Sequence, residues 1–325
     1  LQNNKDSSLG NMLDKVPGIS NSSWGDSVGR PTIRGMDRNR IKILNNGMEI
    51  RDVSSMSGDH AIGLDGLAAE QVEVIKGPET ILYSGGAIGG VINIIDYRIH
   101  PEFIEGVVGN YNLSAGGANN AKAGAVLLDV GAGNIMYHVD LYNRDTKNLK
   151  IPGFSVSKRL ADSDAEFTRG KYGDGTLINS YNETKGGGVG ATYFFDKGYT
   201  GLSLARHDQE YGTILEDGAY IDLVSQNLKY VFEKNDLSGL IKKFKFKLSH
   251  TDYQHKEIEA DGSTGLDYYD KGADAKFEVA HSLISPSGGV AGVDVGSYRF
   301  SQETKPYEPN NNRQNLSFYA LERFE

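Results

Sequence analysis

The sequence predicts a small α/β domain over residues 1–97, followed over residues 98–325 by antiparallel strands of a transmembrane β-barrel. Two observations predict this division. A short helical pattern and a few separate strand patterns occupy the first part, whereas from about residue 103 apolar and polar residues alternate through ten consecutive segments. Alternation with a period of two, over segments of about ten residues, is typical of strands that cross a membrane as a barrel.

The N-terminal domain is predicted to hold one short helix and several strands. Residues 7–13 form the helical pattern, which a Pro-Gly pair ends. Strands are predicted over residues 40–44, 71–75 and 90–95, where β-branched and other apolar residues gather. Residues 45–48 contain Asn-Gly, the strongest short signal for a hairpin turn. We therefore expect a small mixed unit.

The later segments each have one apolar and one charged face. In residues 134–141, Ile, Tyr, Val and Leu alternate with Asn, Met, His and Asp, and in residues 243–248 Phe and Leu alternate with Lys. The apolar face of such a strand packs on a second sheet in a soluble sandwich, or faces lipid in a membrane barrel whose lumen takes the charged face.

The predicted connections favour the membrane barrel. They alternate between short and long, as they do where short periplasmic turns and long extracellular loops join an up-and-down barrel. The predicted short connections are 131–133, 196–198, 235–239 and 284–289, and the long ones are 145–186, 208–221, 253–271 and 302–313.

Composition excludes several classes of function. The net charge of −9 argues against nucleic acid as a partner, because phosphate binding needs clustered Lys and Arg. The absence of cysteine excludes disulfides and thiolate metal sites. The glycine-rich residues 85–90 lack the Lys-Ser/Thr of a phosphate loop, and no nucleophile, base and orienting group form a plausible set. We expect no enzymatic activity.

Residues 34–95 resemble the plug domain of TonB-dependent outer-membrane receptors. The matching motifs include Arg34-Gly35, the run 72–78 that ends in Lys76-Gly77-Pro78, and the run 87–94 that contains Gly89-Gly90. The resemblance implies a gated importer in the bacterial outer membrane that contacts lipid and lipopolysaccharide. It also implies that an inner-membrane TonB complex supplies the energy through a TonB box that precedes residue 1.

A barrel that encloses such a plug needs about 22 strands. An open sheet in lipid leaves unpaired edges, which a bilayer does not tolerate. We therefore expect the ten segments to be the N-terminal part of the barrel, and we expect a signal peptide, a TonB box and further strands outside this sequence.

Residues 45–47 and 54–61 are similar to the zinc-uptake (ZnuD-type) branch of these receptors. That resemblance implies an Asp-His pair at the plug apex that takes part in metal binding, here Asp59 and His60. Carboxylate and imidazole suit zinc, and imidazole also suits nickel. The metal is then cargo rather than a resident cofactor, and the remaining ligands come from the barrel wall or loops. One departure is that the 7 histidines are scattered, with no His-rich loop.

Other interpretations of these residues stay open. Asp59 can instead cap a short helical turn over residues 61–64 while His60 faces solvent. His255, Glu257 and Glu259 alternate and can share one face, but the favoured interpretation places them in a solvated extracellular loop. His138 is interpreted as a hydrogen-bonding group of the lumen. A further set is expected to pair with carboxylates of the barrel wall: Arg34, Arg38, Arg40, Lys76 and Glu73.

Two alternative functions accompany the zinc receptor. One is a haem or iron-siderophore receptor: haem binding needs His or Tyr axial ligands in extracellular loops, and Tyr is plentiful, with 18 residues. A soluble β-rich surface adhesin is the alternative from another class of protein, and independence of detergent would distinguish it.

Overall fold

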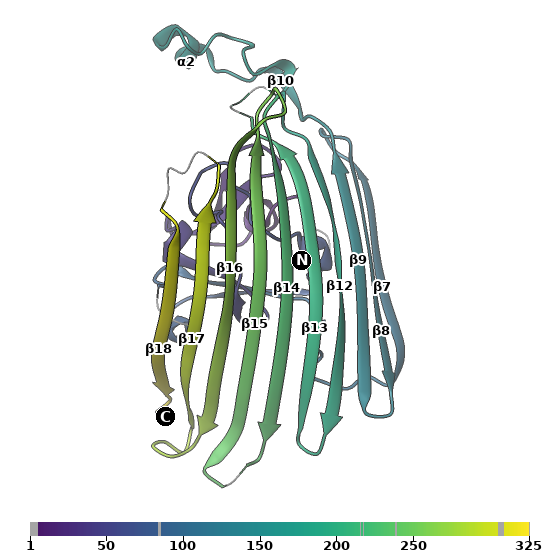
Figure 1. The fold of residues 1–325 in the computed structure, drawn as a ribbon, viewed down its shortest axis with the longest axis vertical. Helices are drawn as coiled ribbons and strands as arrows, with labels where there is room; N and C mark the ends of the chain where they lie inside the picture. Colours follow the sequence, from purple (N-terminus) through teal and green to yellow (C-terminus); the bar gives the residue numbers. More distant parts are fainter. Residues whose placement is uncertain are drawn as a thin grey trace.

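The structure is a computed structural model that describes residues 6–83, 86–214, 216, 218–237, 239–304 and 309–324. It consists of an N-terminal domain and a large curved sheet. Figure 1 shows the N-terminal domain, in purple, lying behind the strands and against their concave side. Ion pairs join the two parts, including Arg51 to Asp270 and Arg144 to Asp65.

The N-terminal domain is built on a four-stranded sheet with the order β4-β3-β6-β5. β3 (Ile41–Asn45) pairs in parallel with β6 (Gly90–Ile95), and β4 (Met48–Glu49) and β5 (Gln71–Ile75) pair antiparallel at the two sides. The predicted strands 71–75 and 90–95 are confirmed, as is the hairpin turn at the Asn-Gly pair. The other elements are α1 (Leu9–Leu13), β1 (Ile19–Ser23), β2 (Gly29–Ile33) and short 3-10 helices at Arg38–Arg40, Gly66–Ala68 and Pro78–Tyr83.

The core of this domain lies between α1 and the sheet. It is formed by buried aliphatic residues that include Leu13, Ile33 and Ile92, all fully buried. Gly90 permits this packing because its φ is +145° and a Cβ atom there would lie 2.8 Å from the Ile33 side chain. The last glycine of the glycine-rich run therefore serves close packing rather than phosphate binding.

Ten antiparallel strands form one up-and-down sheet, with β7 and β18 at its two edges. This confirms the expected number of strands, and the sheet is not closed into a barrel. The domain boundary expected at residue 97 falls in the linker between β6 and β7. The strands are β7 (Gly106–Gly116), β8 (Ala121–Ala132), β9 (Ile135–Thr146), β12 (Asn182–Phe195), β13 (Gly198–Gly212), β14 (Tyr220–Asn235), β15 (Ile241–Ile258), β16 (Thr264–His281), β17 (Gly289–Gln302) and β18 (Asn311–Glu322).

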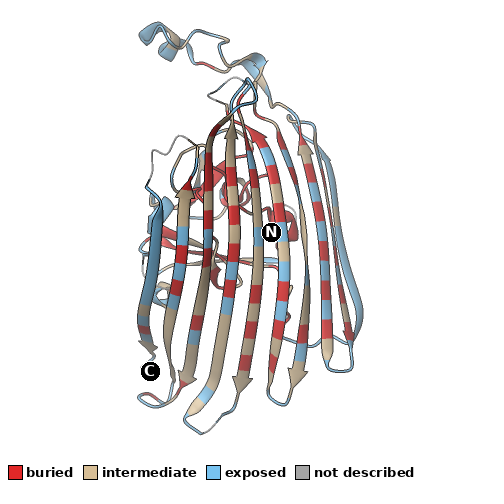
Figure 2. Cartoon of the chain, viewed as in Figure 1, coloured by how far each residue is buried: buried red, intermediate tan, exposed pale blue. Residues whose placement is uncertain are grey.

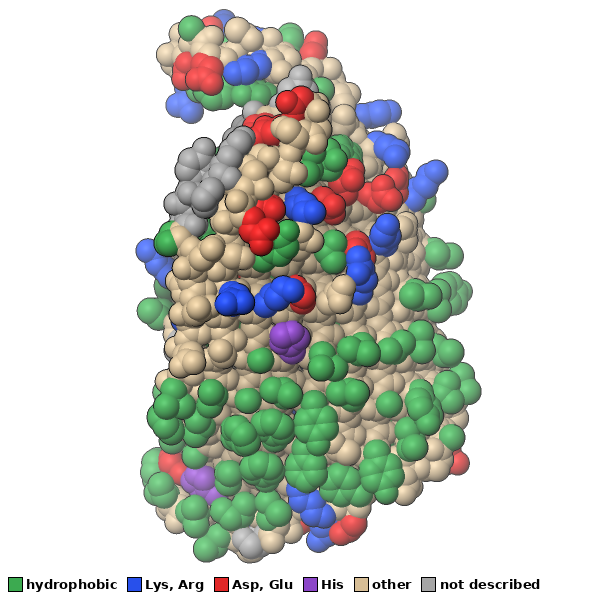
Figure 3. Space-filling view, in the orientation of Figure 1, with side chains coloured by type: hydrophobic (Ala, Val, Ile, Leu, Met, Phe, Trp, Pro, Cys, Tyr) green, Lys and Arg blue, Asp and Glu red, His purple; other side chains and the backbone are tan. Residues whose placement is uncertain are grey.

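The convex face of the sheet carries a broad apolar belt, which is green in the lower half of Figure 3. Burial alternates along inner strands such as β9 and β13, as Figure 2 shows, and the exposed residues of the belt include Leu141, Leu204 and Phe277. Aromatic rings of neighbouring strands contact one another at its lower part, as Phe246 and Phe277 do with ring centroids 4.6 Å apart. Such a belt is what a strand sheet presents to lipid. Among the described residues, no helix is both long and apolar enough to cross a membrane.

The predicted alternation of short and long connections is largely wrong. The connection 147–181 is long and contains β10 (Lys150–Phe154), α2 (Lys158–Ser163) and β11 (Asp174–Thr176). The connections 213–219 and 259–263, however, are about as short as those at the other end, because β13 to β16 continue well beyond their predicted ends. The polar segments that the sequence predicts to be loops are therefore extensions of the strands beyond the apolar belt.

The expectation that the signature charges pair with the wall is wrong for two of them. The Lys76 ammonium donates to the Pro17 carbonyl, and Glu73 accepts from Asn93, so both partners lie within the domain. Arg51 instead joins the domain to the wall. Its guanidinium donates to both oxygens of Asp270 at 2.9 and 2.8 Å and lies 3.7 Å from the centroid of the Tyr298 ring.

Candidate metal centre

His60, His255 and Glu257 bring three metal-ligating atoms together between the N-terminal domain and the sheet. His60 lies in the domain segment that follows β4, whereas His255 and Glu257 lie on β15. The His60 Nε2 atom is 3.0 Å from Glu257 Oε1, the His255 Nε2 atom is 3.8 Å from the same oxygen, and the two imidazole centroids are 4.3 Å apart. Two imidazoles and a carboxylate are a ligand set found in zinc sites.

The far nitrogens of both rings are held by neighbours, which orients the near nitrogens. The His60 Nδ1 atom lies 3.0 Å from the Val53 carbonyl oxygen, which can only accept, so Nδ1 carries the proton. The His255 Nδ1 atom lies 3.1 Å from the Tyr253 hydroxyl, while its buried Nε2 has no hydrogen-bond partner. Outer contacts of this kind fix the ring orientation of metal-bound histidines.

Tyr211 of β13 fixes the backbone on both sides of His60. Its hydroxyl accepts from the Ala61 N–H at 2.8 Å and donates to the Asp59 carbonyl at 3.2 Å. The Asp52 carboxylate closes the base of the same segment, because it accepts from the backbone N–H groups of Ser54 and Gly63 at 2.9 and 3.0 Å. Burial raises the pKa of Asp52, and these hydrogen bonds oppose that shift.

The three ligand atoms sit in an enclosed setting with one opening. The side chains of His60 and His255 are 3% and 0% exposed, while Glu257 is 30% exposed. Apolar and aromatic residues surround the rings, and this dry shell strengthens the electrostatic attraction between a cation and the carboxylate. The shell consists of Val28, Val53, Ala61, Tyr211, Ile221, Leu223, Tyr253 and Tyr268.

The structure places only some of the predicted ligands in this cluster. His60 joins the cluster, but the Asp59 carboxylate accepts from the Ser57 hydroxyl instead. The alternative in which Asp59 caps a helical turn and His60 faces solvent is wrong, since His60 is buried and residues 61–64 form no helical turn. The interpretation of His255 as a solvated loop residue is also wrong, because it is a fully buried residue of β15. Glu259 lies just beyond β15 and is exposed.

The signature residues have structural roles. Arg34 and Gly35 occupy a turn with φ of +52° and +76°, and Gly77 has a φ of +91° just before the 3-10 helix that begins at Pro78. A Cβ atom on Gly89 would lie 2.9 Å from both Ile41 and Met36. These residues shape the domain, and the chemistry of the metal centre belongs to other residues.

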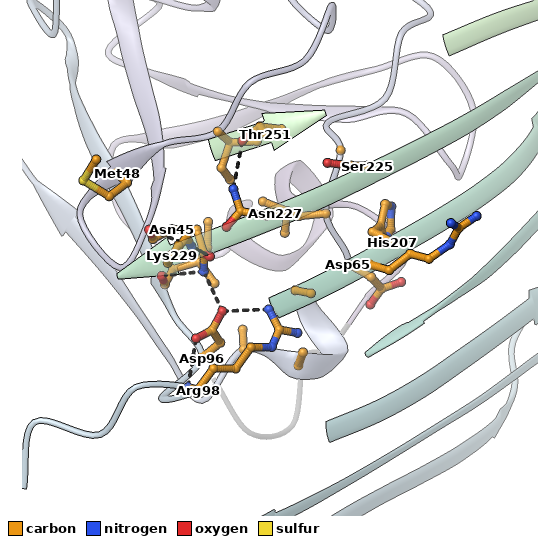
Figure 4. Close-up of a pocket in the computed structure, with 18 of the residues that line it drawn as sticks. Asn45, Met48, Asp65, Asp96, Arg98, His207, Ser225, Asn227, Lys229 and Thr251 are labelled. Carbon is orange, nitrogen blue, oxygen red and sulfur yellow. Dashed lines mark hydrogen bonds and ion pairs between the residues drawn. The ribbon is translucent and has the colours of Figure 1, made fainter. Parts of the chain in front are cut away.

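A cavity of about 90 Å³, lined by both charged and apolar side chains, lies between the domain and the wall. Figure 4 shows Asp65, Asp96 and Arg98 facing His207, Asn227 and Lys229 across it. The Lys229 ammonium donates to the Asn45 carbonyl at 3.1 Å, and Asn227 donates to Thr251 at 2.8 Å. At roughly 30 Å³ per water in the liquid, the space suits a few waters or a small hydrated ion.

Comparison with known proteins agrees with this architecture. Residues 1–91 match the family model of the TonB-dependent Receptor Plug Domain. The iron-regulated outer membrane virulence protein of Vibrio cholerae serotype O1 is 33% identical over 118 residues, which cover 34% of this chain and 17% of that protein.

Solved structures match nearly the whole chain. The copper transporter OprC has a TM-score of 0.74 at 16% identity, covering 97% of this chain and 50% of that one. The F5-1 variant of the FrpB iron transporter from Neisseria meningitidis has a TM-score of 0.70 at 14% identity, covering 93% and 47%. The hemophore receptor HasR of Serratia marcescens has a TM-score of 0.68 at 14% identity, covering 98% and 47%.

The chain therefore spans about half the length of the solved structures it resembles, with the same fold. It is a bacterial outer-membrane protein whose residues 1–91 match the TonB-dependent receptor plug domain, followed by antiparallel strands with the fold of the copper transporter OprC.

Proposed function

We propose that this chain is the plug and part of the barrel of a TonB-dependent receptor that imports a divalent metal ion, zinc foremost. The observation that carries the proposal is the convergence of His60, His255 and Glu257 on one point between the plug and the wall. Three protein ligands leave a fourth position of a tetrahedral site to water or to a ligand that arrives with the ion.

The site lies toward the end of the sheet that carries the long connection 147–181. Long connections of outer-membrane barrels face outward, and β15 runs from its short turn at Ile241 toward Ile258, so His255 and Glu257 lie on the extracellular side. Cargo from outside meets Glu257, the most exposed of the three ligands, first. An inner-membrane TonB complex that pulls on the plug would then release the ion.

The donor atoms suit a divalent metal such as zinc or nickel better than copper(I). Imidazole nitrogen with carboxylate oxygen suits zinc, whereas copper(I) prefers the sulfur of Cys or Met. The names of the similar proteins mention iron, copper and a hemophore, so haem or an iron-siderophore complex is the alternative cargo. Such a chelate is far larger than the enclosed space between two buried imidazoles, and this favours the bare ion.

Calorimetric titration of the full-length receptor in detergent tests the proposal. We expect zinc to bind, and we expect His60→Ala, His255→Ala and Glu257→Gln each to weaken binding by more than about 100-fold, beyond the usual effect of losing an outer-shell contact. His250→Ala is the matched control, because His250 lies on the same strand but is exposed on the outer face. Asp59→Ala should also leave zinc affinity unchanged.

Two outcomes would overturn the proposal. One is unchanged zinc affinity in all three ligand variants. The other is tight binding of haem or a ferric siderophore by a receptor that ignores zinc.

A further inference from the structure

A second cluster of metal-ligating atoms lies on the wall where the plug connects to the barrel. His100 belongs to the linker between β6 and β7, Asp129 to β8 and His138 to β9, and all three residues are buried. The His100 Nε2 atom is 2.8 Å and the His138 Nδ1 atom 2.7 Å from the same oxygen, Asp129 Oδ1. Two imidazole nitrogens and one carboxylate oxygen thus lie within 4.8 Å of one another.

The fold holds His100 firmly in this position. Its backbone N–H donates to the Thr192 hydroxyl of β12 at 3.0 Å. The preceding linker residues press against a glycine-lined groove of the wall, where a Cβ atom on Gly190 would lie 1.7 Å from the Arg98 carbonyl oxygen and one on Gly201 would lie 2.4 Å from Ile99. A side chain at either glycine would displace the linker and with it the histidine.

The surrounding charges leave Asp129 to the two histidines. Arg98 donates to both Asp140 oxygens at 2.7 and 2.8 Å and to Asp96 at 2.9 Å, so these two carboxylates already face a permanent cation. The hydrogen bonds and ion pairs of Asp129 given by the described residues are those to His100 and His138. A divalent cation between the three would supply the positive charge that a guanidinium supplies to the neighbours.

The strand register places this cluster at the far end of the cavity from the first metal centre. His255 is level with Leu223, Gln209, Thr184 and then Arg144 across the successive strands. Arg144 is six residues (144 − 138 = 6) above His138, or about 20 Å along the strand at 3.3 Å per residue.

The cavity lies at a height between the two levels, and its lining on β14 extends from Lys229 up to Ser225. By the same register, Lys229 is level with His138, and Asn227 and Ser225 lie two and four residues higher. All three line the cavity, and so does Arg98, which joins the cavity to the lower cluster through Asp140. The cavity and the second ligand set therefore both lie below the level of the first centre.

We propose that His100, Asp129 and His138 form a second divalent-cation site, which takes the ion on its passage toward the periplasm. This proposal rests on the proposed function for the identity of the cargo, but its ligands are separate residues. The nitrogen and oxygen donors suit zinc or nickel, and a cation bound there tethers the plug linker to the wall.

Titration of the full-length receptor in detergent with Co²⁺, followed by its visible absorption, tests the second site. We expect two equivalents to bind to the wild type. His100→Gln with His138→Gln should remove one equivalent and leave the other, and His60→Gln should remove the complementary one. Asp129→Asn, which keeps the shape of the side chain, provides a second lower-site variant, and exposed His250→Gln is the matched control.

The outcomes separate the two proposals. If both lower-site variants keep the full wild-type stoichiometry, the second site is wrong, whatever His60→Gln does. If His60→Gln keeps both equivalents while the lower-site variants lose one, the first centre and the proposed function fail but the second site stands. Anomalous diffraction from zinc-soaked crystals gives an independent readout: a peak among the three residues is expected, and its absence at saturating zinc contradicts the proposal.

Discussion

Removal of one hydroxyl group, in Tyr211→Phe, tests whether the metal centre depends on a positioned His60. In the structure this hydroxyl holds the Ala61 N–H and the Asp59 carbonyl, the two backbone groups that flank His60. The Phe variant keeps the buried ring and its packing but leaves the Ala61 N–H without its partner. An unsatisfied buried donor costs about 1–3 kcal/mol.

The segment around His60 can avoid that cost by leaving its position, so the fraction of receptor with all three ligands in place falls. Because 1.4 kcal/mol corresponds to tenfold in an equilibrium constant, we expect zinc affinity to weaken by roughly 5- to 150-fold. Calorimetric titration measures this in detergent. Tyr199→Phe is the matched control, since Tyr199 is a buried tyrosine of the same strand that bonds Glu233 far from the site. Equal zinc affinity of Tyr211→Phe and the control would refute the reasoning.

Three further predictions concern the plug and its attachment. Arg51→Ala leaves the partner carboxylate on β16 buried without a cation, so denaturant unfolding should show a loss of about 3–5 kcal/mol, whereas Arg206→Ala in an exposed pair should cost at most about 1 kcal/mol. Gly190→Ala places a Cβ atom 1.7 Å from the linker backbone and should lower the melting temperature, unlike Gly109→Ala, whose Cβ meets ordinary contacts at 3.6 Å. Burial raises the pKa of Asp52, so protonation of this carboxyl favours the folded state. As pH falls toward the pKa of an unfolded Asp, near 3.9, the wild type should therefore gain stability relative to Asp52→Asn. Thermal unfolding of both proteins across a pH series measures this difference. No pH trend in that difference would contradict the burial argument.

The plug strands were predictable because their patterns are local. Residues 71–75 and 90–95 are short apolar runs between turn residues, and the structure begins and ends β5 and β6 at the same positions. The Asn-Gly turn likewise follows from φ angles of +53° and +78°, which Asn and Gly adopt more readily than other residues.

The upper parts of the barrel strands were not predictable from polarity alone. Within the apolar belt, one face of each strand is apolar, so the alternation of apolar and polar residues is clear in the sequence. Above the belt, the outward residues Asp252 and Lys256 meet solvent while the inward residues His255 and Glu257 face the plug, so both faces of the strand carry polar side chains. A strand with two polar faces has the sequence pattern of a loop, and for this reason the sequence predicts a solvated position for His255.

The choice of Asp59 as a metal ligand was wrong because it rested on adjacency in the sequence. Asp59 adjoins His60, yet its carboxylate accepts from Ser57, and the carboxylate that reaches His60 comes from Glu257, 197 residues away. Only the pairing of plug and wall could identify it, because that contact is tertiary. Tyr211 was missed for the same reason, since nothing in its local sequence marks it as the anchor of a distant backbone.

The division of ligands between two bodies gives the two candidate sites different responses to movement of the plug. His60 moves with the plug while His255 and Glu257 stay on the wall, and metal sites tolerate only about 0.2 Å of change in ligand distance, so a small displacement breaks the first centre. His100 belongs instead to the linker, which the Gly190 groove and the Arg98 ion pairs fasten to the wall that carries Asp129 and His138. If an inner-membrane complex pulls on the plug as proposed, we expect the first centre to open before the second, so the second site would still hold an ion after the first has lost its ligand geometry.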